Sequence, residues 1–392
     1  ISCISLKKLF LMRQYSTLFL FSLVFSITSC GQENESIPTK RIDAIEKSDY
    51  NFSIDDFLNQ SDALDQRTNS IFNSLSEKQK VAQLIMPAAG KYGKPHATIN
   101  SLIEDGLIGG ILMLNGTVDE FTNWIKGYNK INSSKGNLPF LYSADAEPSL
   151  VNRKIIGSTP VKKANEINSI EEVEEVTKKI SSDLNKIGIN YNFSLVVNMS
   201  PNSTVGYRSF GKNPENIIPW SNQFIQSTQS KNIIATAKHF PGHGLVSGDT
   251  HKSLQVINGP LKEVQNYPPL IENGVLSIMV AHIAIENNPS FSTMGLPSTC
   301  SPRIVRDLLR DSLQFKGLIV TDAMNMGGVR NVQNNSIKAI AAGCDILLMP
   351  ADARSAHKAL LHAYQTNLEG IQKTINASVR RIIRMKLCLG LL

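Results

Sequence analysis

The sequence has little cysteine and no concentrated charge, and both absences narrow what the protein can be. Its five cysteines are scattered and no C-x-x-C pair is present, which excludes a disulfide framework and gives no support to a zinc site. The formal net charge of +7 is spread over 392 residues without a basic run. Aromatic residues are not interleaved with Arg and Lys, so nucleic acid is not the expected partner. A hydrophobic fraction of 42% remains, enough to bury a large core.

The first thirty residues predict a lipid anchor. LFLFSLVFSITSC (residues 18–30) is apolar, follows a short basic head and is too short to cross a bilayer as a folded helix, so it is typical of a signal peptide. Because its last four residues resemble the bacterial lipobox, we expect a lipoprotein signal peptide over residues 1–29 and a lipidated Cys30 on the periplasmic or outer-membrane face. The alternative is an ordinary signal peptide with a chance cysteine. Residues 30–52 are polar and predict a flexible spacer.

Beyond this spacer the sequence contains no second linker, and short apolar runs alternate with amphipathic helical patterns, as at residues 169–189 and 301–315. Apolar runs without polar interruption are typical of strands covered on both faces. Eight of them alternating with helices predict an α/β fold, a single (β/α)8 TIM-type barrel over residues 53–392. A doubly wound open sheet is the alternative, but no G-x-G-x-x-G follows the first strand. The predicted strands are residues 81–88, 108–115, 139–147, 190–198, 233–240, 276–283, 317–324 and 344–350.

Polar side chains stand at the ends of several of these predicted strands. In TIM-type barrels the catalytic groups lie at the carboxyl ends of the strands, where they face one pocket. The residues at or just past the strand ends are Asp145, Asn198, Lys238, His239, His282 and Asp322. We therefore expect these side chains to converge on a single site.

The stretch KHFPGHGLVSGDTH (residues 238–251) contains three histidines, a lysine and an aspartate within fourteen residues. Lys238 and His239 end a strand, glycines and a proline form a turn, and Asp249 stands two residues before His251. A carboxylate beside an imidazole makes a proton-transfer pair. A metal site built from His239, His243, Asp249 and His251 is the alternative, but the spacing matches no compact metal motif and Lys238 would repel a cation. We expect no metal and no cofactor.

These motifs resemble glycoside hydrolase family 3, and more narrowly its β-N-acetylhexosaminidase branch. The resemblance rests on KHFPGHG (238–244), the Asp-x-His that follows it, VAHI (280–283) and IVTDAM (319–324). NFSLVVN (192–198) and YRSFGKNPE (207–215) support it, and it covers roughly residues 70–392 in unbroken order.

The resemblance implies a retaining glycosidase. Asp322 would be the nucleophile that forms a glycosyl-enzyme intermediate, and His251, oriented by Asp249, would be the general acid and base in place of the usual second carboxylate. The residues that would bind the terminal N-acetylglucosamine are Asp145, Arg153, Arg208, Lys238, His239 and His282. For Arg208 the alternative is a salt bridge that holds its loop, and for His282 it is a buried core histidine.

The sequence also departs from the family pattern. DAEPSLV (145–151) stands where the family usually has Asp-Gln-Glu-Gly-Gly-Arg-Val, so that Asp145, Glu147 and Arg153 are kept while Leu150 replaces an arginine. Asn198 stands where an aspartate is expected, and the segments after His251 and Asp322 are short. These departures put substrate affinity in question more than the chemistry.

Two kinds of function follow from these expectations. The first is an exo-β-N-acetylglucosaminidase that acts on peptidoglycan fragments, such as muropeptides, or related glycans. If the protein is an enzyme of another specificity, the alternatives are a β-glucosidase or xylosidase, or a phosphorylase. The second is a non-catalytic glycan-binding lipoprotein that keeps the barrel and whose sequence has diverged from the family pattern at DAEPSLV. In each case we expect a monomer that contacts the membrane only through its lipid.

Overall fold

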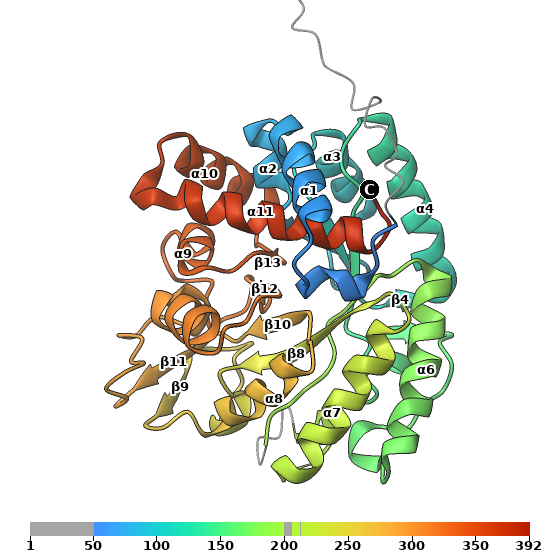
Figure 1. The fold of residues 1–392 in the computed structure, drawn as a ribbon, viewed down its shortest axis with the longest axis vertical. Helices are drawn as coiled ribbons and strands as arrows, with labels where there is room; N and C mark the ends of the chain where they lie inside the picture. The colour runs from blue at the N-terminus through green and yellow to red at the C-terminus, as the bar shows by residue number, and fades with distance from the viewer. Residues whose placement is uncertain (1–50, 200–205, 212) are drawn as a thin grey trace, which may run out of the picture. The chain divides into compact units, whose positions relative to one another are not determined.

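The computed structural model describes residues 51–199, 206–211 and 213–392 (Figure 1). The predicted signal peptide, the lipidated Cys30 and nearly all of the predicted spacer lie outside the described residues. Within the described part of the chain, no helix combines the length and the apolar character that a membrane span requires.

A parallel sheet forms the centre of the fold, and the predicted TIM-type barrel is confirmed. Seven of its strands lie in the order β12-β10-β8-β7-β5-β3-β2, and β1 pairs with β13. β2 continues the path of β1 beyond Pro87. On the other side of the sheet, Thr321 N–H donates to Ile346 O (3.0 Å) and Met324 N–H donates to Leu348 O (2.8 Å), which joins β12 to β13. Because β13 also pairs with β1, the sheet closes. The strands are β1 Ile85–Met86, β2 Ala88–Ala89, β3 Gly110–Met113, β5 Leu141–Ala144, β7 Tyr191–Asn192, β8 Ile234–Phe240, β10 Ser277–Val280, β12 Leu318–Thr321 and β13 Leu347–Leu348.

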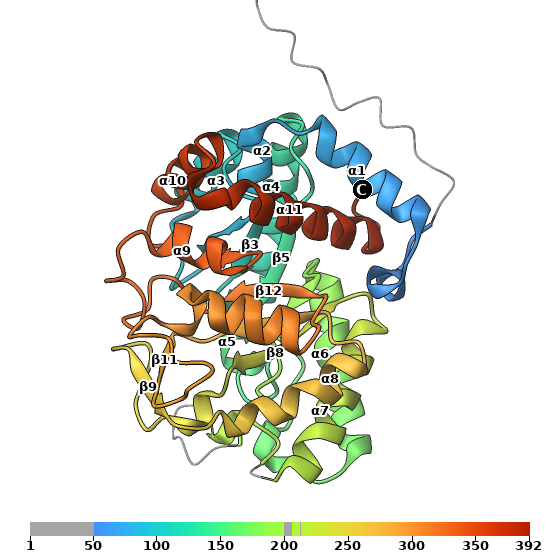
Figure 2. The same ribbon diagram turned by 60° about the vertical axis from the view of Figure 1, so that its left-hand side comes forward.

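A helix follows each strand position and covers the outside of the sheet (Figures 1 and 2). The α-helices are α1 Asp62–Ser74, α2 Glu77–Ala82, α3 His96–Glu104, α4 Val118–Ser134, α5 Val151–Lys154, α6 Ile170–Ile187, α7 Pro214–Gln229, α8 Tyr267–Glu272, α9 Asn335–Ala342, α10 Ala353–Gln365 and α11 Ile371–Cys388. The short 3-10 helices are η1 Ile54–Leu58, η2 Ala164–Glu166, η3 Gly206–Arg208, η4 His243–Leu245, η5 Lys262–Asn266, η6 Ser298–Cys300 and η8 Leu368–Gly370. Two small parallel sheets, β4 Gly116–Thr117 with β6 Ile155–Ile156 and β9 Gln255–Asn258 with β11 Ile283–Glu286, lie in the connecting segments.

Helix α6 shows how the local sequence sets these elements. The Ser169 side chain accepts a hydrogen bond from Glu172 N–H and caps the first turn, and Gly188 ends the helix at a φ of 97°. Val173, Ile180 and Leu184 lie on its buried face, as the helical spacing of the apolar residues requires. The helix predicted over residues 169–189 is therefore present.

Other predicted boundaries were wrong. The run predicted as a strand over 81–88 begins inside α2, because Val81 and Ala82 belong to an amphipathic capped helix rather than to the sheet. The run 190–198 forms a ladder only at Tyr191–Asn192, and Val196 makes isolated bridges to Ser209 and to Lys238. The helix predicted over 301–315 is a π-helix, η7 Arg303–Ser312.

The last helix closes the fold against the first one (Figure 2). Arg384 of α11 donates from Nε to Phe57 O (2.7 Å) and from Nη1 to an Asp65 carboxylate oxygen (2.5 Å). The Arg380 guanidinium lies 3.6 Å from the centroid of the Phe72 ring. Segments more than 300 residues apart in sequence thus share one packing surface.

A buried carboxylate organises the amino-terminal side of strands β12 and β13. Asp345 is fully buried and forms ion pairs with Arg310 and Arg381. It also accepts hydrogen bonds from Ser378 Oγ (2.7 Å) and from Ile319 N–H (2.8 Å). Burial of a carboxylate is tolerated because every partner here is charged or is an N–H or O–H donor.

Candidate active site

A cavity of about 480 Å³ opens where the strands end at their carboxyl side. Its walls are partly apolar, with Leu112, Met279 and Leu348 contributed by β3, β10 and β13. Seven of the nine residues predicted to act in catalysis or substrate binding line it: Asp145, Arg153, Arg208, Lys238, His239, His251 and Asp322. The structure thus brings together residues that are up to 177 positions apart in sequence.

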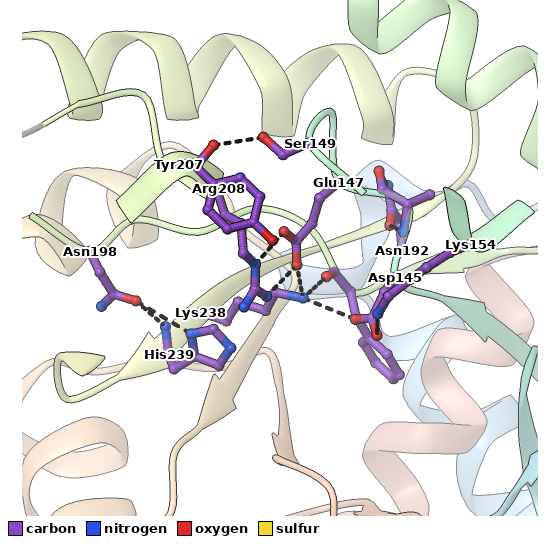
Figure 3. A network of polar contacts seen from close by, with 12 residues as sticks. Asp145, Glu147, Ser149, Lys154, Asn192, Asn198, Tyr207, Arg208, Lys238 and His239 are labelled. Carbon is purple, nitrogen blue, oxygen red and sulfur yellow. Dashed lines mark hydrogen bonds and ion pairs between the residues drawn. The ribbon is translucent and has the colours of Figure 1, made fainter. Parts of the chain in front are cut away.

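Several of the lining residues belong to a network of charged side chains, which Figure 3 shows. Lys238 Nζ is 2.6 Å from a Glu147 carboxylate oxygen and 3.0 Å from Asp145 Oδ1. Arg208 donates from Nε (2.8 Å) and Nη2 (2.6 Å) to the two oxygens of Glu147. Lys154 Nζ binds the remaining oxygen of Asp145 at 2.6 Å. Three cations therefore neutralise two carboxylates, and one positive charge remains in excess.

The network fixes the charge of each member. Burial alone would raise the pKa of Glu147, but Arg208 and Lys238 outweigh it and lower that pKa to about 2. In the same way Lys154 and Lys238 overcome the effect of burial on Asp145 and hold its pKa below the ordinary value. Burial would lower the pKa of Lys238, but Asp145 and Glu147 raise it. Near neutral pH all three groups are charged and present fixed hydrogen-bonding geometry to a ligand.

A β-bulge lets two consecutive residues face one cavity. In a regular strand neighbouring side chains point to opposite faces. In the pairing of β8 with β10, Met279 lies opposite Lys238 and Val280 lies opposite Phe240, so His239 is the extra residue. The break in alternation allows both Lys238 and His239 to line the cavity.

His239 is neutral and is held by Asn198. Burial, with the charges of Arg208 and Lys238, lowers the pKa of His239 well below its usual value. Asn198 Oδ1 accepts from His239 N–H at 3.2 Å and lies 3.3 Å from His239 Nδ1, while Asn198 Nδ2 donates to Glu263 at 3.0 Å. Asn198, which stands where the family has an aspartate, therefore bridges His239 and the buried Glu263.

Asp322 follows β12 and lines the cavity. One of its carboxylate oxygens, Oδ1, accepts a hydrogen bond from Ala323 N–H at 2.8 Å. Asp322 N–H donates to Val280 O at 2.9 Å, which fixes the backbone at the end of the strand. A carboxylate with one oxygen held by its own loop can direct the other oxygen toward a bound ligand.

Asp249 and His251 form the predicted pair at the mouth of the cavity. His251 Nδ1 is 2.7 Å from Asp249 Oδ1, which also accepts from His251 N–H at 2.9 Å. These contacts overcome the effect of burial and lower the pKa of Asp249. The side chain of His251 lines the cavity and is 61% exposed, so its ring is accessible from solvent.

The position of His282 differs from the one expected for substrate contact, whereas Arg153 lines the cavity as expected. His282 is fully buried and does not line the cavity. Its Nε2 donates to Ala323 O (3.0 Å) and its Nδ1 accepts from the Thr299 hydroxyl (2.8 Å). This environment fits the alternative interpretation, in which His282 is a buried core histidine with both ring nitrogens hydrogen-bonded. Arg153 does line the cavity but bonds only Tyr207 Oη, at 3.5 Å, among the described residues.

Several further residues belong to the site although the sequence motifs assign them no role there. Glu147 is fully buried and binds both Arg208 and Lys238. Lys154 and Tyr207 also line the cavity. The signal for Glu147 and Lys154 was their place beside predicted site residues, in DAE and in Arg-Lys. Leu150, which replaces the family arginine, is buried in the cavity wall.

The described residues contain no group of three or more His, Cys, Asp or Glu side chains arranged to hold a metal ion. Instead of pointing to a shared centre, the four residues of the metal alternative take different partners. His239 contacts Asn198, while His243 contacts Thr250 and His251 contacts Asp249.

Comparison with known proteins shows to which family the chain is similar. The family model described as "Glycosyl hydrolase family 3 N terminal domain" matches residues 76–385. The chain is 29% identical over 332 residues to "Beta-hexosaminidase A" of Pseudoalteromonas piscicida, which is 74% of this chain and 54% of that protein. It is 28% identical over 261 residues to "Beta-hexosaminidase" of Glaesserella parasuis serovar 5 (strain SH0165), 63% of this chain and 75% of that protein.

A solved structure gives the same result. A family 3 β-N-acetylglucosaminidase from Paenibacillus sp. str. FPU-7 superposes with a TM-score of 0.73 at 28% sequence identity, and covers 81% of this chain. The chain spans 63% of that structure and 54% of the Pseudoalteromonas protein, so the similarity concerns only part of each.

Proposed function

The chain belongs to glycosyl hydrolase family 3, and we propose that it is a retaining, exo-acting β-N-acetylglucosaminidase. The observation that carries the proposal is the cavity itself: Asp322 and the Asp249-paired His251 line the same space as the buried network around Lys238. The names of the relatives, β-hexosaminidase and β-N-acetylglucosaminidase, support the sugar class.

In the first step a carboxylate oxygen of Asp322 attacks the anomeric carbon of the terminal sugar. His251 Nε2–H gives its proton to the glycosidic oxygen, which departs with the bonding electrons, and a glycosyl ester of Asp322 remains. Asp249 holds Nδ1 of the ring at 2.7 Å, so it stabilises the protonated imidazole that donates and presents Nε2 to the leaving group.

In the second step His251 Nε2 removes a proton from water, and the water oxygen attacks the anomeric carbon. The bond to Asp322 breaks, the carboxylate is released and the sugar keeps its original configuration. The two displacements from opposite faces require one residue to act as acid and then as base, and an imidazole held by a carboxylate can do both near neutral pH.

The charged network is proposed to bind the hydroxyls of the terminal sugar. Asp145 and Arg208 keep part of their side-chain surface exposed, at 19% and 12%, whereas Lys238 and Glu147 are buried at 2% and 0%. We therefore assign direct sugar contacts to Asp145 and Arg208, with Lys238 and Glu147 fixing their orientation. Because charged groups make strong hydrogen bonds, a fixed array of this kind can select one arrangement of hydroxyls.

The test compares release of 4-nitrophenol from the β-N-acetylglucosaminide and from the β-glucoside. We expect turnover of the first, a fall in kcat of at least about a thousandfold in Asp322→Asn, and a glycosyl adduct on Asp322 in mass spectra of enzyme quenched during turnover. Turnover of the glucoside alone would replace the N-acetyl specificity with a β-glucosidase. Sugar binding without turnover of either substrate would identify a glycan-binding protein, and glycosyl phosphate formed in phosphate buffer would identify a phosphorylase.

For the natural setting we propose a monomeric lipoprotein at the periplasmic or outer-membrane face that acts on N-acetylglucosamine-containing peptidoglycan fragments. The lipobox-like residues 27–30 and the polar spacer support the anchor. Cys30→Ser should move the enzyme from the membrane fraction to the soluble fraction without a change in kcat, and light scattering of the purified protein should give the mass of one chain. An unchanged distribution of Cys30→Ser would refute lipidation at this cysteine.

A further inference from the structure

His243, the second histidine of KHFPGHG, has no role in the mechanism described above and does not line the cavity. It is 2% exposed and lies at the start of η4, with its Nε2 3.0 Å from the hydroxyl of Thr250. Thr250 is 1% exposed and stands between Asp249 and His251. A buried hydrogen bond thus holds the one residue that separates the two members of the proton-transfer pair.

The same segment is held on another side by the loop that follows Asp322. Gly328 N–H donates to Thr250 O at 3.0 Å, and Gly327 N–H donates to His251 O at 2.9 Å. A Cβ on Gly327 would lie 2.0 Å from the carbonyl oxygen of Lys252, so the close approach of the two backbones requires glycine there. The loop carrying the nucleophile and the segment carrying the acid and base are therefore joined directly.

Nothing comparable holds the His251 side chain itself. Its contact among the described residues is with Asp249, and the two side chains are 61% and 32% exposed. An exposed pair whose side chains meet at one contact has little to fix their position relative to other groups. The buried contacts of its backbone neighbours must supply that position.

We propose that His243, acting through the Thr250 hydroxyl, is a positioning residue that fixes His251 relative to Asp322, together with the backbone contacts of Gly327 and Gly328. This inference rests on the proposed function. Proton transfer requires Nε2 of His251 within hydrogen-bonding reach of the glycosidic oxygen while Asp322 attacks the same sugar. A displacement of about 1 Å at such a site lowers the rate on the order of a hundredfold.

The test uses Thr250→Val, which removes the hydroxyl and keeps the shape, with Thr250→Ser as the matched control that keeps the hydroxyl. Each is assayed on two substrates, the β-1,4-linked disaccharide of N-acetylglucosamine and 2,4-dinitrophenyl β-N-acetylglucosaminide. The disaccharide has a poor leaving group that needs protonation, whereas dinitrophenolate departs without it. We expect Thr250→Val to lower kcat/KM for the disaccharide by about 30- to 100-fold and for the dinitrophenyl glycoside by less than about threefold, and Thr250→Ser to restore the first value.

A second readout follows from the base role of His251. For the dinitrophenyl substrate, release of the sugar from Asp322 becomes rate-limiting in Thr250→Val, so kcat and KM should fall together while kcat/KM is kept. Azide, which needs no base, should raise kcat and yield the glycosyl azide. His243→Phe, which alters the other partner of the hydrogen bond, should show the same pattern if Thr250→Val does not fold.

Equal losses on the two substrates, or none, would overturn the positioning role, because loss of folded protein or of the nucleophile affects both substrates alike. Failure of the wild-type enzyme on both substrates would instead refute the proposed function on which the inference rests.

Discussion

Glu263→Gln is expected to remove a pH-dependent weakness of the fold. Glu263 lies in η5 and is fully buried. Its Oε2 accepts from Gly244 N–H and from Asn198 Nδ2, both at 3.0 Å, while Oε1 has no partner among the described residues. A Cβ on Gly242 or Gly244 would come within 2.8 Å or 2.1 Å of a Glu263 carboxylate oxygen, so the KHFPGHG turn wraps closely around this group.

Burial raises the pKa of Glu263 from 4.5 to about 7, although the hydrogen bonds from Gly244 and Asn198 oppose the rise. A raised folded-state pKa means that the folded protein binds the proton more tightly than the unfolded chain does. The stabilisation is fully present below the unfolded value of 4.5 and is lost as the pH rises through 7. Since one pKa unit corresponds to about 1.4 kcal/mol, the loss amounts to about 3 kcal/mol.

The measurement is the free energy of unfolding in urea at pH 5 and at pH 8 for the wild type and for Glu263→Gln. The amide keeps an acceptor for Gly244 and Asn198 but does not ionise, so the variant should be more stable than the wild type at pH 8 by about 2–3 kcal/mol and within about 1 kcal/mol of it at pH 5. Other titrating groups cancel in the difference between the two proteins. A difference that does not change with pH would show that Glu263 does not titrate in this range, and the reasoning would fail.

Three further substitutions test other parts of the structure. Lys238→Met should cost about 3–5 kcal/mol in the free energy of unfolding, because Asp145 and Glu147 lose a shared buried cation; an unchanged unfolding curve would contradict this. Asp345→Asn should lower stability by about 3 kcal/mol but leave kcat per folded molecule unchanged, as checked by active-site titration, since Asp345 lies at the opposite end of its strand. Gly327→Ala should lower kcat/KM for the disaccharide about a hundredfold, and wild-type kinetics would show that the segment tolerates the added methyl group.

The apolar runs of the sequence were sufficient to predict the barrel. Strands covered on both faces need uninterrupted apolar residues, and each predicted run contains a strand of the closed sheet. The same runs located Asp145 and Asp322, because a polar residue near the end of such a run lies at the carboxyl end of a strand. Boundaries were less accurate at residues 81–84, where a capped helix has the same apolar content as a strand.

The electrostatic arrangement of the site could not be predicted in this way. Nothing in the sequence shows that Lys238 forms ion pairs with both Asp145 and Glu147, because this depends on the path of the chain beyond β5. The bulge at His239 is likewise a property of the pairing between β8 and β10. His282 illustrates the opposite case, since a strand-end position predicted substrate contact and the packing buried both ring nitrogens against Thr299 and Ala323.

The sequence alone therefore determined the family and the barrel, and located the segments of the proposed nucleophile and the proposed proton-transfer pair, because these depend on local apolar periodicity and on short motifs. The tertiary structure decided how the segments meet. It placed Thr250 between His243 and Gly328, set Glu147 against Lys238 and left the His251 side chain at the open side of the cavity. Such contacts join residues far apart in sequence, and their geometry follows from strand register and loop packing, which no local pattern records.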